Sequence, residues 1–222
     1  MADSENPLMV PQDIADLPVK FDDSVFDDIA KSKDYLSRVQ VMGGNSDYVK
    51  EAKIQIGHYA LIHNKDSFAD LTQQFDCLVV GWRPKAMDVG GEQVISVYNH
   101  EKDEFKRIQE KSAEQNSGCM FGPEYLLWLA EAKTFATFFF SSKSARREAG
   151  NMKSCVGRAA TCRIQLIKTK KFSWHSPEIV ACSTPFDIPG VPELKEQLEK
   201  FNNPPESDIE TVDDAEKSDR ER

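Results

Sequence analysis

Apolar and polar residues alternate along several short stretches of the chain, a pattern that predicts half-buried β-strands. The alternation is clearest from residue 160 to residue 166. Further strands are expected where apolar residues alternate or cluster, at residues 53–62, 76–82, 93–98, 125–129, 133–142 and 178–182. The Gly90-Gly91 pair separates two of these stretches, and a Gly-Gly step between strands favours a hairpin.

Helical spacing and helix-boundary residues predict three helices between these strands. The first spans residues 101–115 and is mostly polar. The second is expected to begin after Ser142 or Ser144, which are good N-cap residues, and to end before Gly157. The third begins near Pro192, which suits a first helical turn, and carries apolar side chains at helical spacing.

This order of elements predicts a mainly β fold with helices, of class α+β. A Greek-key β-barrel of the oligonucleotide-binding (OB) type, with added helices, accommodates the order of short strands and two helices. We expect the barrel and its C-terminal helix to occupy residues 37–202. Residues 1–36 are expected to form an acidic, partly disordered arm, and residues 203–222 an acidic, disordered tail.

Composition indicates an intracellular, soluble protein, cytoplasmic in its own cell or in a host cell if the chain is viral. The 222 residues include 40% hydrophobic ones, but no apolar run is long enough to cross a bilayer. The N-terminus shows no basic segment followed by an apolar one, as a secretory signal would. The five cysteines form no CxxC pair, so we expect reduced, mostly buried thiols and no metal site.

Charge is strongly segregated along the chain. Residues 133–175 contain ten Lys or Arg and one acid, Glu148, which gives this stretch a net charge of +9. Because the whole chain carries −9, the other 179 residues carry −18. Such a division creates a positive surface within an anionic molecule, and it favours an anionic partner.

Aromatic residues are interleaved with these cations, which points to a polyanion that carries flat bases. The predicted nucleic-acid-binding residues are Trp82, Arg83, Lys85, Phe138, Phe140, Lys143, Arg146, Arg147, Lys153, Arg158, Arg163, Lys168, Lys170, Lys171, Phe172 and Trp174. The cations would track phosphates and the rings would stack on bases. The phenylalanines from 135 to 140 have an alternative role as core residues, because strands usually bury alternating aromatics.

Motifs of catalysis are missing from the sequence. Gly43 and Gly44 do not begin the pattern of a phosphate-binding loop, and no G-x-S-x-G elbow or G-x-G-x-x-G turn occurs. We therefore expect a protein that is not an enzyme and that uses no cofactor.

The strand order, the segment KTKKFSWH at 168–175 and the acidic segment from Glu206 to Glu216 resemble phage-encoded single-stranded DNA-binding proteins of the OB-fold type. The resemblance implies sequence-tolerant binding and protection of single-stranded DNA in replication or recombination. It also implies an acidic tail that competes with DNA and recruits replication or recombination proteins, often through a terminal aromatic residue. This chain ends at Arg222 without such a residue, which puts the recruitment in doubt.

Two other classes of function remain open at this point. The basic stretch would also suit a non-enzymatic structural or interaction protein, virion-associated or otherwise, that docks onto an acidic partner. An RNA-binding module would use the same cations and rings. The sequence does not distinguish DNA from RNA as the ligand, and it leaves the oligomeric state open.

Overall fold

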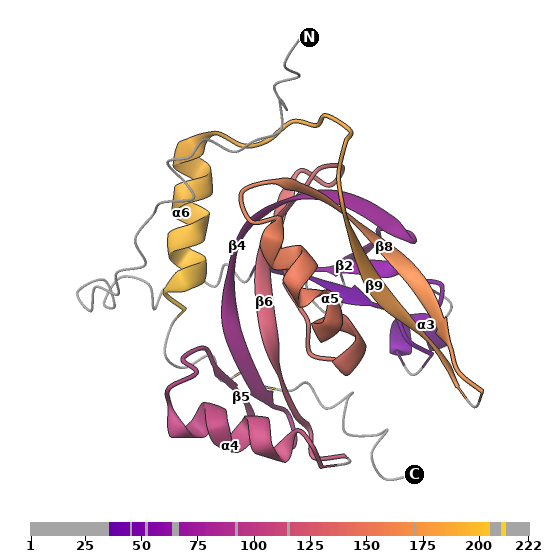
Figure 1. Cartoon of the computed structure of the whole chain (residues 1–222), viewed down its shortest axis with the longest axis vertical. Helices are drawn as coiled ribbons and strands as arrows, with labels where there is room; N and C mark the ends of the chain where they lie inside the picture. Colours follow the sequence, from indigo (N-terminus) through magenta and orange to yellow (C-terminus); the bar gives the residue numbers. More distant parts are fainter. Residues whose placement is uncertain are drawn as a thin grey trace.

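A computed structural model describes residues 36–204, apart from 45, 52, 64–66, 92, 115 and 171, and also residues 210–211. Figure 1 shows helices packed on a strongly curved sheet. The elements are β1 (Ser37–Val41), α3 (Asp47–Lys50), β2 (Tyr59–Ile62), β3 (Phe68–Asp70), β4 (Gln74–Asp88), β5 (Gln93–Val97), α4 (Asp103–Lys111), β6 (Cys119–Leu129), β7 (Thr134–Phe139), α5 (Lys143–Ser154), β8 (Ala159–Lys168), β9 (Ser173–Ala181), α6 (Val191–Asn202) and β10 (Glu210–Thr211).

The long strand β4 organises one mixed sheet. It pairs with β6 along most of its 15 residues, with β8 near its start and with β5 at its end, always antiparallel. On the far side of β6 the order continues through β7, β1, β2 and β3, and the β7–β1 pair is parallel. Among the described strands, β9 pairs with β8 alone. The prediction of a mainly β fold with helices is confirmed, but the sheet does not close into the predicted barrel.

The concave face of the sheet holds the main core, and α5 covers it. Alternate side chains of the strands point inward, and the rings of Tyr59, Phe75 and Phe138 pack edge to face or tilted, with centroids 4.9 to 6.4 Å apart. α5 adds Ala145 and Met152 to this core. The predicted N-cap is confirmed, since the Ser142 hydroxyl accepts a hydrogen bond from the Ala145 amide.

The convex face of β4, β6 and β7 is covered by α6. The three apolar residues at helical spacing, Leu194, Leu198 and Phe201, pack on Leu78, Val80, Leu126, Trp128 and Phe135. Gly81 allows the helix to come this close, because an added Cβ would lie 2.5 Å from a Leu198 methyl carbon. The segment before α6 is attached as well, since the Trp128 indole donates to the Asp187 carbonyl.

The predicted β-hairpin at Gly90-Gly91 is confirmed, and it extends the sheet beyond the main core. β5 returns along the end of β4, and α4 packs on this extension through Phe105 and Ile108. The polar helix is shorter than expected, at nine residues. Its two apolar side chains form a small separate core with Ala86, Val97 and Cys119.

Other predicted boundaries differ from the structure for local reasons. The strand expected at 53–62 is confirmed only at 59–62, because Gly57 has a positive φ of 79° in a turn packed against His175. Conversely, the strands predicted at 76–82 and 178–182 are longer, since β4 continues beyond the core between β5 and β6, and β9 continues beside β8. The predicted acidic N-terminal segment and most of the acidic tail lie outside the described residues, although Glu210 and Thr211 of the tail pair with β5.

Candidate nucleic-acid interface

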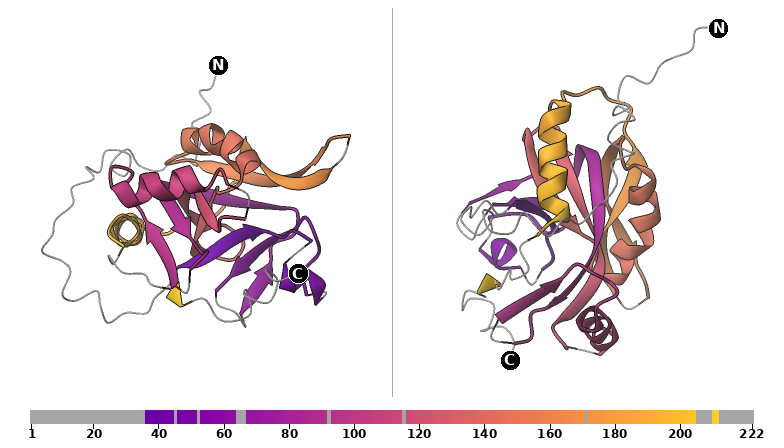
Figure 2. Two further views of the ribbon diagram at one scale, coloured as in Figure 1. Left: turned by 90° about the horizontal axis from the view of Figure 1, so that it is seen from below. Right: turned by 90° about the vertical axis from the view of Figure 1, so that its left-hand side faces the viewer.

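The β8–β9 hairpin continues past the rest of the sheet as a two-stranded projection, residues 164–177, which we name the arm (Figure 2, left). Its turn is closed by two hydrogen bonds, from the Thr169 amide to the Phe172 carbonyl and from the Phe172 amide to the Thr169 hydroxyl. The Phe172 ring is 72% exposed. The arm therefore presents a large apolar ring to solvent at its tip.

Cations flank this ring on the arm. Lys168 and Lys170 are exposed, and Trp174 lies half-buried opposite Ile167 on the paired strand. Lys171, also predicted as a binding residue, lies outside the described residues. The arm thus combines exposed cations with an exposed ring within a few residues, a combination that is common in proteins that bind single-stranded nucleic acid.

α5 lies beside β9, at the base of the arm (Figure 1). Because Ala145 and Met152 point into the core, Lys143 and Arg147 are exposed on the solvent side of the helix. Glu148, the one acid of the basic stretch, points toward β9 and accepts a hydrogen bond from the Ile179 amide. Its negative charge is therefore engaged with the backbone of β9.

Most cations of the basic stretch form no ion pair with any carboxylate in the described part of the chain. Seven are exposed and unpaired in this sense: Lys143, Arg147, Lys153, Arg158, Arg163, Lys168 and Lys170. Lys133 is the exception, with its ammonium 3.8 Å from the Asp187 carboxylate. Elsewhere, cations such as Lys106 and Lys200 pair with acids on their own helix. Within the described residues, these cations therefore lack the direct carboxylate partners that cations elsewhere have.

A cleft of about 400 Å³ lies between α4 and α5, over the ends of β4 and β6. Two cation–ring pairs line it: Lys153 Nζ is 4.5 Å from the Trp82 ring centroid, and the Arg146 guanidinium is 4.3 Å from the Phe121 centroid. Trp82 is 39% exposed. Arg146 is also held by the Phe121 and Ser141 carbonyls, and its partial burial lowers the pKa of the guanidinium.

Arg83 and Lys85 lie on the opposite, convex face and contact protein groups. Both pair with Glu124, which is 2% exposed, with nitrogen–oxygen distances of 2.7 and 2.8 Å. Burial favours the neutral carboxyl, but attraction to Lys85 and Arg83 outweighs it and lowers the pKa of Glu124. The guanidinium also lies between the rings of Tyr98 and Phe201. With α6 in place, these two predicted residues are engaged within the protein.

Phe138 and Phe140 are corrected from predicted binding residues to core residues. Their exposed fractions are 3% and 0%, and their ring centroids lie 4.7 Å apart inside the concave core. The alternation of β7 directs Phe138 inward, and Phe140 follows it just before α5 begins. Neither ring is accessible to a base.

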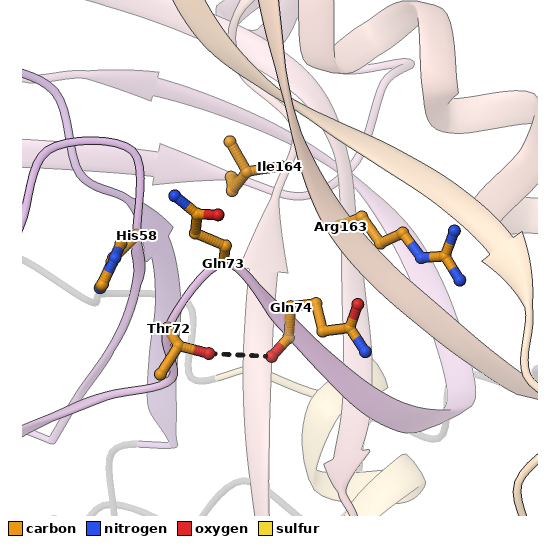
Figure 3. Close-up of a pocket in the computed structure, with 6 residues that line it drawn as sticks. All are labelled: His58, Thr72, Gln73, Gln74, Arg163 and Ile164. Atoms are coloured by element: carbon orange, nitrogen blue, oxygen red, sulfur yellow. Dashed lines mark hydrogen bonds between the residues drawn. The ribbon is translucent and has the colours of Figure 1, made fainter.

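A second cleft, of about 420 Å³, lies where β8 passes the turn between β3 and β4 (Figure 3). Arg163 extends away from the other side chains that line it, while His58 lies on the opposite side. The His58 imidazole is 2.9 Å from the Asp70 carboxylate. Arg163 therefore adds to the exposed cations, but the side chains of this cleft do not converge on one point.

Metal-ligand clusters and membrane-spanning helices are both absent from the described residues. No group of three or more His, Cys, Asp or Glu side chains is placed to hold a metal ion. No helix of this part of the chain has the length and apolar character that a membrane span requires. Comparisons with protein-family models, curated proteins and solved structures found no match to this chain.

Two residues of the α4–α5 cleft escaped the sequence reasoning. Phe121 precedes the stretch predicted as a strand at 125–129, and Gly150 lies inside the helix predicted between Ser142 and Gly157. The segment CMFGPEY contained a usable signal, because a ring before Gly-Pro is unusual in a regular central strand. Arg146, which contacts Phe121 at the cleft, is 25 residues further along the chain. Only the fold therefore shows that these two residues meet.

Proposed function

We propose that the protein binds single-stranded DNA with little sequence preference, through the exposed face of α5 and the arm. The observation that carries the proposal is the set of seven exposed cations without described carboxylate partners on α5, on or next to β8, and on the arm, together with the exposed Phe172 ring. When Lys and Arg side chains neutralise DNA phosphates, counterions are released, and this release supplies most of the affinity of non-specific DNA binding. Each base stacked on an aromatic ring adds roughly 1–3 kcal/mol, whatever its identity.

We further propose an OB-like core built from β4, β6, β7, β8 and β9. Three antiparallel pairings support it, because they give the spatial order β8–β4–β6–β7 of a Greek key. α5 connects β7 to β8, and β9 completes the five strands. In OB folds the loop between the last two strands contacts oligonucleotides, and the arm occupies this place in the chain.

The proposed path of the DNA differs from the usual one on this fold. OB folds commonly bind along the face of their second and third strands, which correspond to β6 and β7. In this protein α6 packs on the convex face of those strands. We therefore place the DNA along α5 and the arm. Protection of single strands in phage replication or recombination, as the resemblance implies, is the biological role we propose.

The decisive experiment is a titration of intrinsic tryptophan fluorescence with unlabelled oligo-dT at several salt concentrations. We expect quenching and an affinity that falls steeply with salt, with a slope of about −0.7 per phosphate neutralised. The double variant Lys143→Glu/Arg147→Glu should bind far more weakly. The matched control Lys195→Glu/Lys200→Glu changes the same amount of charge on α6 and should bind better than that variant. Absence of binding by the natural chain at low salt would refute the proposal and favour a protein-docking role.

A further inference from the structure

Gly150 lies in the middle of α5, faces the α4–α5 cleft and has open space around its Cα. A Cβ built at this position would meet no atom within 4 Å, apart from its own helix backbone and chain neighbours. Its φ is not among the positive values found at other glycines. Neither backbone conformation nor close packing therefore requires a glycine here.

A glycine at this position has a cost. Glycine in a helix interior is about 1 kcal/mol less favourable than alanine, because it loses more backbone freedom on folding. Its main effect on the surface is to leave the α5 side of the cleft open, between Arg146 and Lys153. This open space would be filled by almost any other helix-forming residue.

The walls of the cleft suit a flat ring with a negative charge attached. Trp82, Phe105 and Phe121 supply aromatic surface, and Pro84 and Pro123 add apolar contacts. The two cations that lie over Trp82 and Phe121 stand at this surface. The Lys153 side chain is exposed, so its ammonium can leave the indole ring and reach a phosphate.

We infer that this cleft is a nucleobase site, in which one base of a bound strand stacks on Trp82 and its phosphate is held by Lys153. A volume of about 400 Å³ is within the usual range of small-ligand sites and too small for a peptide helix. The inference rests on the proposed function, since the base reaches the cleft as part of a strand bound along α5. It adds a second place for stacking besides Phe172.

The test compares oligo-dT with an abasic oligomer of equal length, which has the same phosphates without bases. Gly150→Leu fills the cleft, and Gly150→Ala is the matched control that fills it least. We expect Gly150→Leu to lose about fivefold or more of the preference for oligo-dT over the abasic oligomer, with unchanged abasic affinity. Gly150→Ala should retain the preference. Trp82→Phe should also remove part of the fluorescence quenching by oligo-dT.

Thermal unfolding of each variant checks that the variant is folded. If Gly150→Leu does not fold, Trp82→Ala tests the opposite wall of the cleft. Two failures are distinguishable. If the natural chain binds oligo-dT but neither Gly150→Leu nor Trp82→Ala changes the preference for oligo-dT over the abasic oligomer, the cleft is not a base site and the proposed function stands. If the natural chain binds neither oligomer, the proposed function itself is wrong.

Discussion

The guanidinium of Arg83 stacks on the ring of Phe201, 4.1 Å from its centroid, and donates a hydrogen bond to the Phe201 carbonyl. This carbonyl belongs to the last turn of α6, where cations are favoured by the helix dipole. On the sheet side, Glu124 holds the same guanidinium. The docking of α6 on the convex face therefore depends on a buried ion pair as well as on apolar contacts.

Glu124→Gln should destabilise the fold strongly. The change leaves Arg83 and Lys85 without their buried counter-charge, and breaking such a pair costs about 3–5 kcal/mol. The measurement is the free energy of unfolding from urea denaturation. Glu131→Gln, at an exposed position in the turn between β6 and β7, is the control and should change it by less than about 0.5 kcal/mol. Equal effects of the two substitutions would contradict a stabilising role of the buried pair.

The Glu124 carboxyl should also account for part of the loss of stability at acidic pH. Because the pKa of Glu124 is lower in the folded protein than in the unfolded chain, its contribution is complete above the unfolded pKa of about 4.3. It is lost as the pH falls from there through the folded pKa. The difference in unfolding free energy between the natural chain and Glu124→Gln should therefore shrink below about pH 5. A pH-independent difference would show that the charge of Glu124 does not matter.

Removing two cations of the arm should reduce the salt dependence of DNA binding. Lys168→Ala/Lys170→Ala deletes two proposed phosphate contacts, so the slope of log affinity against log salt should become less steep by about 1.4. Lys195→Ala/Lys200→Ala on α6 is the control and should leave the slope unchanged. Fluorescence titrations with oligo-dT measure both. An unchanged slope in the arm variant would remove the arm from the interface.

Phe172→Ala should separate binding from stability. The ring is 72% exposed, so its removal should change the unfolding free energy by less than about 0.5 kcal/mol. If a base stacks on it, affinity for oligo-dT should fall by about 5- to 150-fold, which corresponds to roughly 1–3 kcal/mol. Phe172→Trp should retain the affinity. A loss of stability without a loss of affinity would mean that the ring packs within the protein.

Truncation after Pro204 tests competition by the acidic tail, which has six acids and no base from Glu206 to Glu216. If the tail competes for the basic surface, oligo-dT should bind more tightly to the truncated chain. The gain should fade with salt, because the screening length falls from about 30 Å at 0.01 M to about 8 Å at 0.15 M. Substituting the six acids by their amides is the length-matched control and should reproduce the gain. Unchanged affinity at low salt would exclude competition.

Local signals predicted the elements well where the chain has strong periodicity or a clear boundary residue. Ser142 begins α5, Gly90-Gly91 lies in a hairpin and α6 begins around Pro192, as expected from their conformational preferences. Sequence reasoning failed where burial decides. Phe138 and Phe172 both lie near cations in sequence, yet one is in the core and the other is exposed.

The alternation of strands and helices and the concentration of positive charge at 133–175 could be predicted before the fold was known, because both depend on residue type and spacing along the chain. Which cations remain available could be read only from the folded chain. It placed Arg83 and Lys85 against Glu124 under α6, and it left Lys168 and Lys170 on the arm. The reason is physical: the state of a charge depends on its neighbours in space, and those neighbours come from distant parts of the chain.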